Sequence, residues 1–112
     1  MSCSDLMQGY AFLKDMYDDS YFPEDLVKKI EGVLRALCVE LERRRPNSLE
    51  ELYLITHSAT NNINELQSEF YERGSDIETG AREAIAEDFS AIARAYGFAN
   101  ADPEELIATR DW

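Results

Sequence analysis

SLEELYLITHSATNNINELQSEFYERG, residues 48–74, carries the clearest helix start and stop in the chain. Ser48, with Glu51 three residues later, has the pattern of a capping box, and Gly74 readily takes the left-handed conformation that ends a helix. These signals predict one continuous helix, which at about 1.5 Å per residue would be roughly 37 Å long. We expect the other helices to pack around it.

Two rows of side chains run along this predicted helix. The first row is apolar, with spacings of four and three, and predicts a seam against a partner helix. Its members are Leu52, Thr56, Ala59, Ile63, Leu66 and Phe70. The second row lies one residue further on and is polar but uncharged, with members Tyr53, His57, Thr60, Asn64, Gln67 and Tyr71. Because a solvated face is normally rich in Lys and Glu, we expect these polar groups to be half-buried and to bind neighbouring helices or a ligand.

Length and composition indicate a single helical domain over residues 1–112. The chain has 112 residues, 45% of them hydrophobic, and can bury roughly 65% of its unfolded surface. A disulfide framework is not expected, since Cys38 lies in an apolar helical run and Cys3 lies near the chain start. With no leader pattern and no apolar run near the roughly 20 residues of a membrane span, a cytoplasmic location is expected.

The net charge restricts the choice of partners. There are 23 acidic and 11 basic residues, which gives a formal charge of −12. That charge repels phosphate backbones and anionic lipid, so neither nucleic acid nor a membrane is expected as a partner. A basic protein partner is favoured, although the acidity can also serve solubility alone.

The N-terminal part predicts two helices. The first begins at Ser4 and ends at residues 18–20, and the second runs from Pro23 to about Arg44 with a wide apolar stripe. Five aromatic residues near the junction predict a small core that joins the two helices rather than a stacking site. They are Tyr10, Phe12, Tyr17, Tyr21 and Phe22. The basic cluster 43–45 is expected to cap the second helix, with binding of an acidic group as the alternative.

The C-terminal part predicts a long helix followed by a short one. Ser75 and Glu78 form a second capping box, which predicts a helix to about residue 96. Asp88 interrupts its apolar face and must find a partner, for which Arg82 is one option, while Glu78 with Arg82 is the better local ion pair. A short helix is predicted over 103–108. The predicted fold is therefore an all-α four-helix bundle with an additional short C-terminal helix.

The chain ends on its only tryptophan, directly after an Arg–Asp pair. We expect this end to fold back onto the bundle, with Trp112 in an apolar groove and its carboxylate near a cation. Removing the last four residues tests this expectation through the melting temperature.

Eight segments of the chain form a recognisable set: YLITHSAT (53–60), INEL (63–66), GSDIET (74–79), ARE (81–83), AYGF (95–98), RDW (110–112), FLKDMY (12–17) and YFP (21–23). Together they resemble a family of small bacterial proteins known only as a domain of unknown function. The resemblance covers nearly the whole chain. It implies little chemistry, and no functional residue is transferred from it.

An enzyme would have to use the single histidine. His57, with Tyr53, Thr60, Asn64 and a carboxylate such as Glu78 or Asp88, has the groups for acid–base chemistry in a polar pocket, as in a small-ligand site or a hydrolase. The usual metal, phosphate and nucleotide motifs are missing, so no metal and no cofactor are expected. A hydrogen-bonded structural histidine is the favoured interpretation.

The favoured function is therefore a non-enzymatic protein-binding module, such as an inhibitor or immunity-type partner of a basic protein. The acidic contact is expected around residues 15–25 or around 65–72. A monomer or weak homodimer is expected. The candidate binding residues are Tyr53, His57, Thr60, Asn64, Gln67, Tyr71, Arg82, Arg110 and Trp112.

Overall fold

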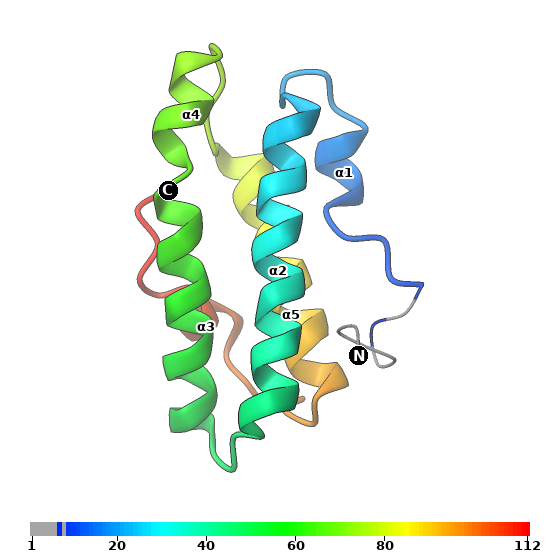
Figure 1. Cartoon of the computed structure of the whole chain (residues 1–112), viewed down its shortest axis with the longest axis vertical. Coiled ribbons are helices and arrows are strands. Elements are labelled where there is room, and N and C mark those ends of the chain that lie inside the picture. The colour runs from blue at the N-terminus through cyan, green and yellow to red at the C-terminus, as the bar shows by residue number, and fades with distance from the viewer. Residues whose placement is uncertain (1–6, 8) are drawn as a thin grey trace.

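The computed structural model describes Met7 and residues 9–112, and that part of the chain is all-α, as predicted from the sequence. It is 66% helical, and no strand occurs among the described residues. The helices are α1 (Lys14–Tyr17), α2 (Glu24–Arg44), α3 (Leu49–Asn64), α4 (Gln67–Glu72), α5 (Thr79–Ala95) and α6 (Pro103–Leu106) (Figure 1). None of them combines the length and apolar character needed to cross a membrane.

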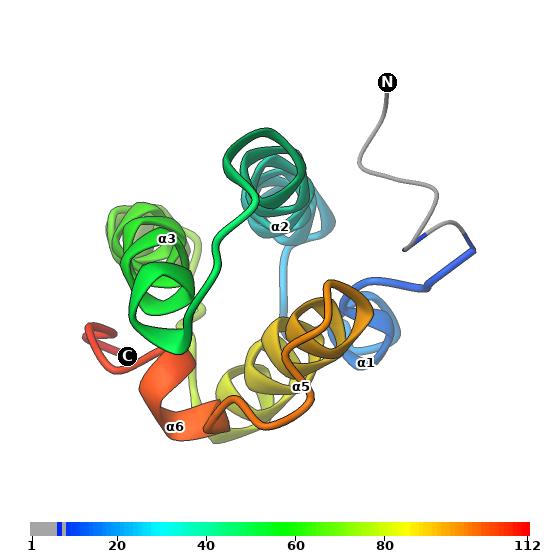
Figure 2. The same ribbon diagram turned by 90° about the horizontal axis from the view of Figure 1, so that it is seen from below.

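Three long helices form the body of the molecule. Helices α2 and α3 lie side by side, and α5 packs behind them with α1 at its side (Figures 1 and 2). The chain after α5 turns back across α3 and α5 through α6. The core is built mainly from buried side chains of the long helices, among them Ile30, Leu34, Leu52, Ile85 and Phe89.

The predicted long first helix is not formed over the described residues. Only Lys14–Tyr17 is helical, because Gly9 has φ 84° and Leu13 has φ 55°, and both angles lie outside the right-handed helical region. The predicted start at Ser4 lies outside the described residues. The four-helix detail of the predicted bundle is therefore not confirmed, since the structure has three helices longer than six residues.

The predicted continuous helix over 48–74 is wrong in one respect. Its start is as predicted, with Ser48 Oγ accepting a hydrogen bond from Glu51 N at 3.1 Å, and Gly74 has the expected positive φ of 75°. The rod is interrupted at Glu65 and Leu66, where Leu66 N donates to the oxygen three residues back, at Ile63, instead of four. This tight turn divides the segment into α3 and α4.

Helices α2 and α5 are present as predicted, but both begin later than predicted. The sequence predicts that helix α2 begins at Pro23, whereas it begins at Glu24, with Pro23 as its N-cap. The predicted capping box at Ser75 is not formed, because α5 begins at Thr79 with Glu78 as N-cap, whose side chain accepts from Ala81 N at 3.2 Å. The hydroxyl of Ser75 is buried and has no hydrogen-bond partner among the described residues.

Candidate functional site

The polar row of α3 binds the C-terminal segment of the same chain. The hydroxyl of Tyr53 accepts a hydrogen bond from Asp102 N at 3.0 Å, and His57 Nε2 donates to the backbone oxygen of Glu105 at 2.7 Å. Thr60 Oγ1 donates to Thr56 O at 2.9 Å and lies 3.4 Å from Leu106 O. Three neighbouring turns of α3 therefore hold residues 102–106 by backbone contacts.

Asn64 continues this row at the end of α3. Its Nδ2 donates to Thr109 O at 3.0 Å, and its Oδ1 accepts from Asp111 N at 2.9 Å. Thr109 Oγ1 donates in turn to His57 O at 3.4 Å. The nitrogen and the oxygen of the Asn64 amide thus each bond to a backbone group near the end of the chain. These backbone groups lie outside any helix and would otherwise lack a hydrogen-bond partner among the described residues.

The C-terminal tryptophan is docked, as the sequence predicted. The side chain of Trp112 is 7% exposed, and Arg82 Nε of α5 donates to its backbone oxygen at 2.9 Å. Its indole Nε1 has no hydrogen-bond partner among the described residues. Arg82 thus binds the chain end rather than Asp88 or the Glu78 side chain.

The remaining candidate binding residues lie at the margins of this contact. Gln67 Nε2 donates to Asn64 O at 3.4 Å, whereas Tyr71 is 63% exposed beyond the break in the helix. Arg110 Nη2 lies 3.6 Å from the Glu104 carboxylate, within the C-terminal segment itself. The polar row is therefore bound by the chain's own residues over α3, and it opens to solvent only at Tyr71.

The structure does not assemble the acid–base constellation around His57. The ring of His57 stacks near Tyr53, with a centroid distance of 6.2 Å, and its nearest carboxylate is that of Glu105 at 3.4 Å. Glu78 caps α5, and Asp88 bonds to the N-terminal segment. His57 lines none of the three cavities of 200 to 260 Å³ that the described residues enclose near α1, α2 and α5.

Asp88 is a buried carboxylate at the contact between α5 and the N-terminal segment. It is 4% exposed, and it accepts hydrogen bonds from Tyr10 Oη at 2.6 Å and Leu13 N at 2.7 Å. Burial raises the pKa of Asp88 above its usual value, and the two hydrogen bonds oppose this rise without cancelling it. Burial and the Asp88 carboxylate together raise the pKa of Tyr10.

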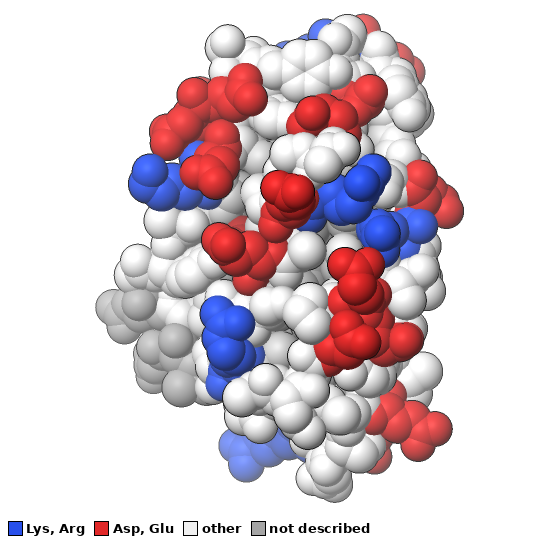
Figure 3. All heavy atoms as spheres, turned by 180° about the vertical axis from the view of Figure 1, so that it is seen from behind, with Lys and Arg blue, Asp and Glu red and all other residues white. Residues whose placement is uncertain are grey.

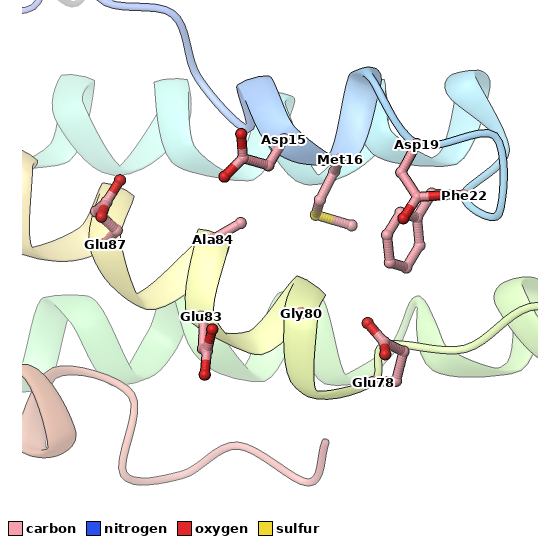
Figure 4. A pocket seen from close by; sticks show the side chains of 9 residues that line it. All are labelled: Asp15, Met16, Asp19, Phe22, Glu78, Gly80, Glu83, Ala84 and Glu87. Atoms are coloured by element: carbon pink, nitrogen blue, oxygen red, sulfur yellow. The ribbon is translucent and has the colours of Figure 1, made fainter.

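An acidic hollow lies between α1 and α5. Its volume is about 260 Å³, and Met16, Phe22 and Ala84 supply its apolar lining. Five acidic residues complete the lining: Asp15, Asp19, Glu78, Glu83 and Glu87. Figure 4 shows Asp15 and Asp19 on the α1 side and the three glutamates on the α5 side. A second cavity of about 200 Å³ adjoins it and shares Asp15, Ala84 and Glu87.

These five carboxylates form no ion pair with any cation of the described chain. Some acids elsewhere are neutralised locally: Asp25 binds Arg73 through both oxygens, at 2.9 and 3.0 Å, and Glu69 binds Lys29 at 2.6 Å. Figure 3 shows that acidic side chains predominate on the face of the molecule that carries α5, with basic ones between them. The hollow is thus a concave and uncompensated part of an acidic face.

The hollow contains part of only one of the two acidic regions that the sequence indicates. Asp15 and Asp19 belong to the expected region 15–25, none of its lining residues comes from 65–72, and Glu83 and Glu87 of α5 lie outside both regions. A signal was present, because both pairs place like charges four residues apart, a spacing that destabilises a helix without a compensating cation. No group of three or more described acidic, His or Cys side chains has the geometry to hold a metal ion.

The chain belongs to the family of unknown function DUF5713, whose model matches residues 6–112. This match covers the fold from the N-terminal segment to Trp112. No match is found among curated proteins or among solved structures.

Proposed function

We propose that this protein is a non-enzymatic binding module of the bacterial cytoplasm, of the inhibitor or immunity type, that docks a basic protein partner at the acidic hollow. The observation that carries the proposal is the set of five carboxylates without an ion pair to any described cation, gathered around one cavity. Such a surface attracts a positively charged partner and speeds its association.

The dimensions of the hollow favour a side chain as its occupant. A volume of about 260 Å³ lies below the usual range of small-molecule pockets, which begins near 300 Å³. The apolar lining suits the methylene stem of a Lys or Arg side chain, while the carboxylates above it bind the charged head. Arginine is the better fit, because its planar fork can bind two carboxylates at once.

The alternative is a small-ligand or hydrolase-like site around His57. It has less support, because His57 Nε2 is bonded to Glu105 O and the neighbouring polar groups hold the C-terminal segment. A ligand at this place would have to displace that segment from α3.

The test compares two variants with the same change of charge. The triple variant Asp15→Asn, Glu83→Gln, Glu87→Gln removes three carboxylates of the hollow, and Glu50→Gln, Glu65→Gln, Glu72→Gln removes three exposed ones outside it. Each protein is immobilised, incubated with lysate of its source organism, and washed at low and high salt. We expect the wild type and the control to retain the same basic protein, released by salt, and the hollow variant to lose it.

Equal loss from both variants would mean that the net charge attracts the partner without a defined site. Retention by the hollow variant would contradict the proposal. A thermal melt of each variant checks that the fold is kept.

A further inference from the structure

A second, apolar groove lies on the opposite part of the surface, between α2 and α3. Its volume is about 220 Å³, and its apolar lining comes from Val33, Ala36, Leu37, Leu54, Ile55 and Ala59. No other described helix covers the outer face of α2 and α3, as the two perpendicular views agree (Figures 1 and 2). Two neighbouring long helices therefore present a shallow apolar channel to solvent.

Large apolar side chains are exposed beside this groove. Leu54 of α3 is 69% exposed, and Val39, one turn beyond Ala36 in α2, is 42% exposed. Residues 54–64 contain no Asp, Glu, Lys or Arg, although 30% of the whole chain is charged. The exposed residues of this run, Leu54, Ser58, Asn61 and Asn62, are therefore all uncharged, as in an interface core, from which charged residues are depleted.

Charge is distributed unevenly between this face and the rest of the molecule. Residues 23–64, which include α2 and α3, contain six basic and seven acidic residues, so this segment carries −1. The rest of the chain carries 16 acidic and five basic residues, or −11, within a total of −12. At the rim of the groove Glu40 and Arg44 form an ion pair at 2.9 Å, and Glu40 also binds Arg43, which does not line the groove. The α2–α3 face is thus the nearly neutral side of a strongly acidic protein.

From this arrangement we infer that the groove binds a second copy of the same chain, in a two-fold homodimer formed by α2 and α3. A two-fold contact places the same patch on itself, so the patch must not carry a net charge of one sign. The uncharged run 54–64 and the neutral Glu40–Arg44 rim meet that condition. A strongly basic or acidic partner would find no opposite charge here. In the dimer, Leu54 of each copy enters the groove of the other.

The size of the face predicts a reversible dimer. The 16 residues of α3 span roughly 24 Å, and two packed helices are roughly 20 Å wide, which gives on the order of 500 Å² for each copy. The total of roughly 1,000 Å² is at the lower limit of specific interfaces. A dissociation constant in the micromolar range is expected. The dimer leaves the acidic hollow between α1 and α5 open, and the inference does not depend on the function proposed for that hollow.

Sedimentation velocity over roughly 1–500 µM protein tests the dimer. We expect the wild type to change from monomer to dimer across this range. Leu54→Lys places two positive charges near the two-fold axis and should raise the dissociation constant at least tenfold, which corresponds to about 1.4 kcal/mol. Because Leu54 is exposed, this variant should melt at the wild-type temperature.

Tyr71→Lys is the matched control, since Tyr71 is a similarly exposed, large and uncharged residue outside the groove, at 63%. It should dimerise as the wild type does. Higher salt should strengthen the dimer, because it screens the repulsion between two chains of −12. A wild type that stays monomeric throughout, a Leu54→Lys variant that dimerises normally, or a dimer that salt dissociates would each overturn the inference. The last result would indicate contact between the acidic hollow and a basic segment instead.

Discussion

Tyr10 donates a 2.6 Å hydrogen bond to the carboxylate of Asp88, which lies 78 residues further along the chain. Asp88 also accepts from Leu13 N, and Leu13 has the left-handed φ of 55° at the residue before α1. The charge of one buried side chain therefore fixes the path of the N-terminal segment across α5. That path places Asp15 and Asp19 opposite the glutamates of the acidic hollow.

Tyr10→Phe should destabilise the protein by about 1–3 kcal/mol at neutral pH, because a buried carboxylate loses a charge-assisted hydrogen bond. The loss should be smaller near pH 4, where more of Asp88 is protonated and needs the donor less. Urea unfolding at both pH values measures the difference. An equal loss of unfolding free energy at both pH values would contradict the idea that Tyr10 mainly stabilises the ionised form of Asp88.

Asp88→Asn should also destabilise the protein, by about 1–3 kcal/mol, since the amide group cannot accept from both donors. The pKa of Asp88 is raised in the folded state, so its carboxyl holds a proton to higher pH than in the unfolded chain. This preference of the folded state for protonated Asp88 stabilises the protein fully below the ordinary pKa of 3.8. The stabilisation is lost as the pH rises through the raised pKa of Asp88 in the folded protein. The advantage of wild type over Asp88→Asn should therefore shrink from about pH 4 to pH 7. An advantage that grows over this interval would refute the raised pKa.

The sequence predicts the long helices well, because their signals are local. Ser48 and Gly74 mark real helix ends, and the apolar spacing of α2 predicts its buried face. The errors arise where distant contacts override local pattern. The apolar spacing of the first segment favours a helix, yet the bond from Leu13 N to Asp88 holds Leu13 outside it.

The candidate site was only partly predictable for the same reason. An uncharged polar row on α3 predicts that neighbouring groups satisfy it, but not that residues 102–111 are those groups. The acidic hollow brings Asp15 close to Glu83 and Glu87, although about 70 residues of sequence separate Asp15 from these two glutamates. Helical spacing relates positions within one element, and only the packing of α1 on α5 brings the two acidic pairs together.

Removing residues 109–112 should lower the melting temperature by at least about 10 °C, since deletion of a buried Trp alone costs about 3–5 kcal/mol. Trp112→Ala should reproduce most of this change, because Trp112 is 7% exposed. Trp112→Phe should cost less than Trp112→Ala, as it keeps an aromatic ring and removes an indole N–H that has no partner among the described residues. Scanning calorimetry measures all three. Unchanged melting of the truncated chain would show that the C-terminal segment does not dock.

Asn64→Ala should loosen the C-terminal segment specifically, because Asn64 alone holds both Thr109 O and Asp111 N from α3. The expected cost is about 1–3 kcal/mol, and the amide proton of Asp111 should exchange with solvent faster. Asn62→Ala is the control, since Asn62 is exposed on the same helix and makes no hydrogen bond through its side chain to the described residues. Hydrogen exchange followed by NMR separates the two variants. If the Asp111 amide exchanges equally fast in Asn64→Ala, Asn62→Ala and the wild type, the segment is held by Trp112 and Arg82 instead, and the polar row of α3 adds nothing to its docking.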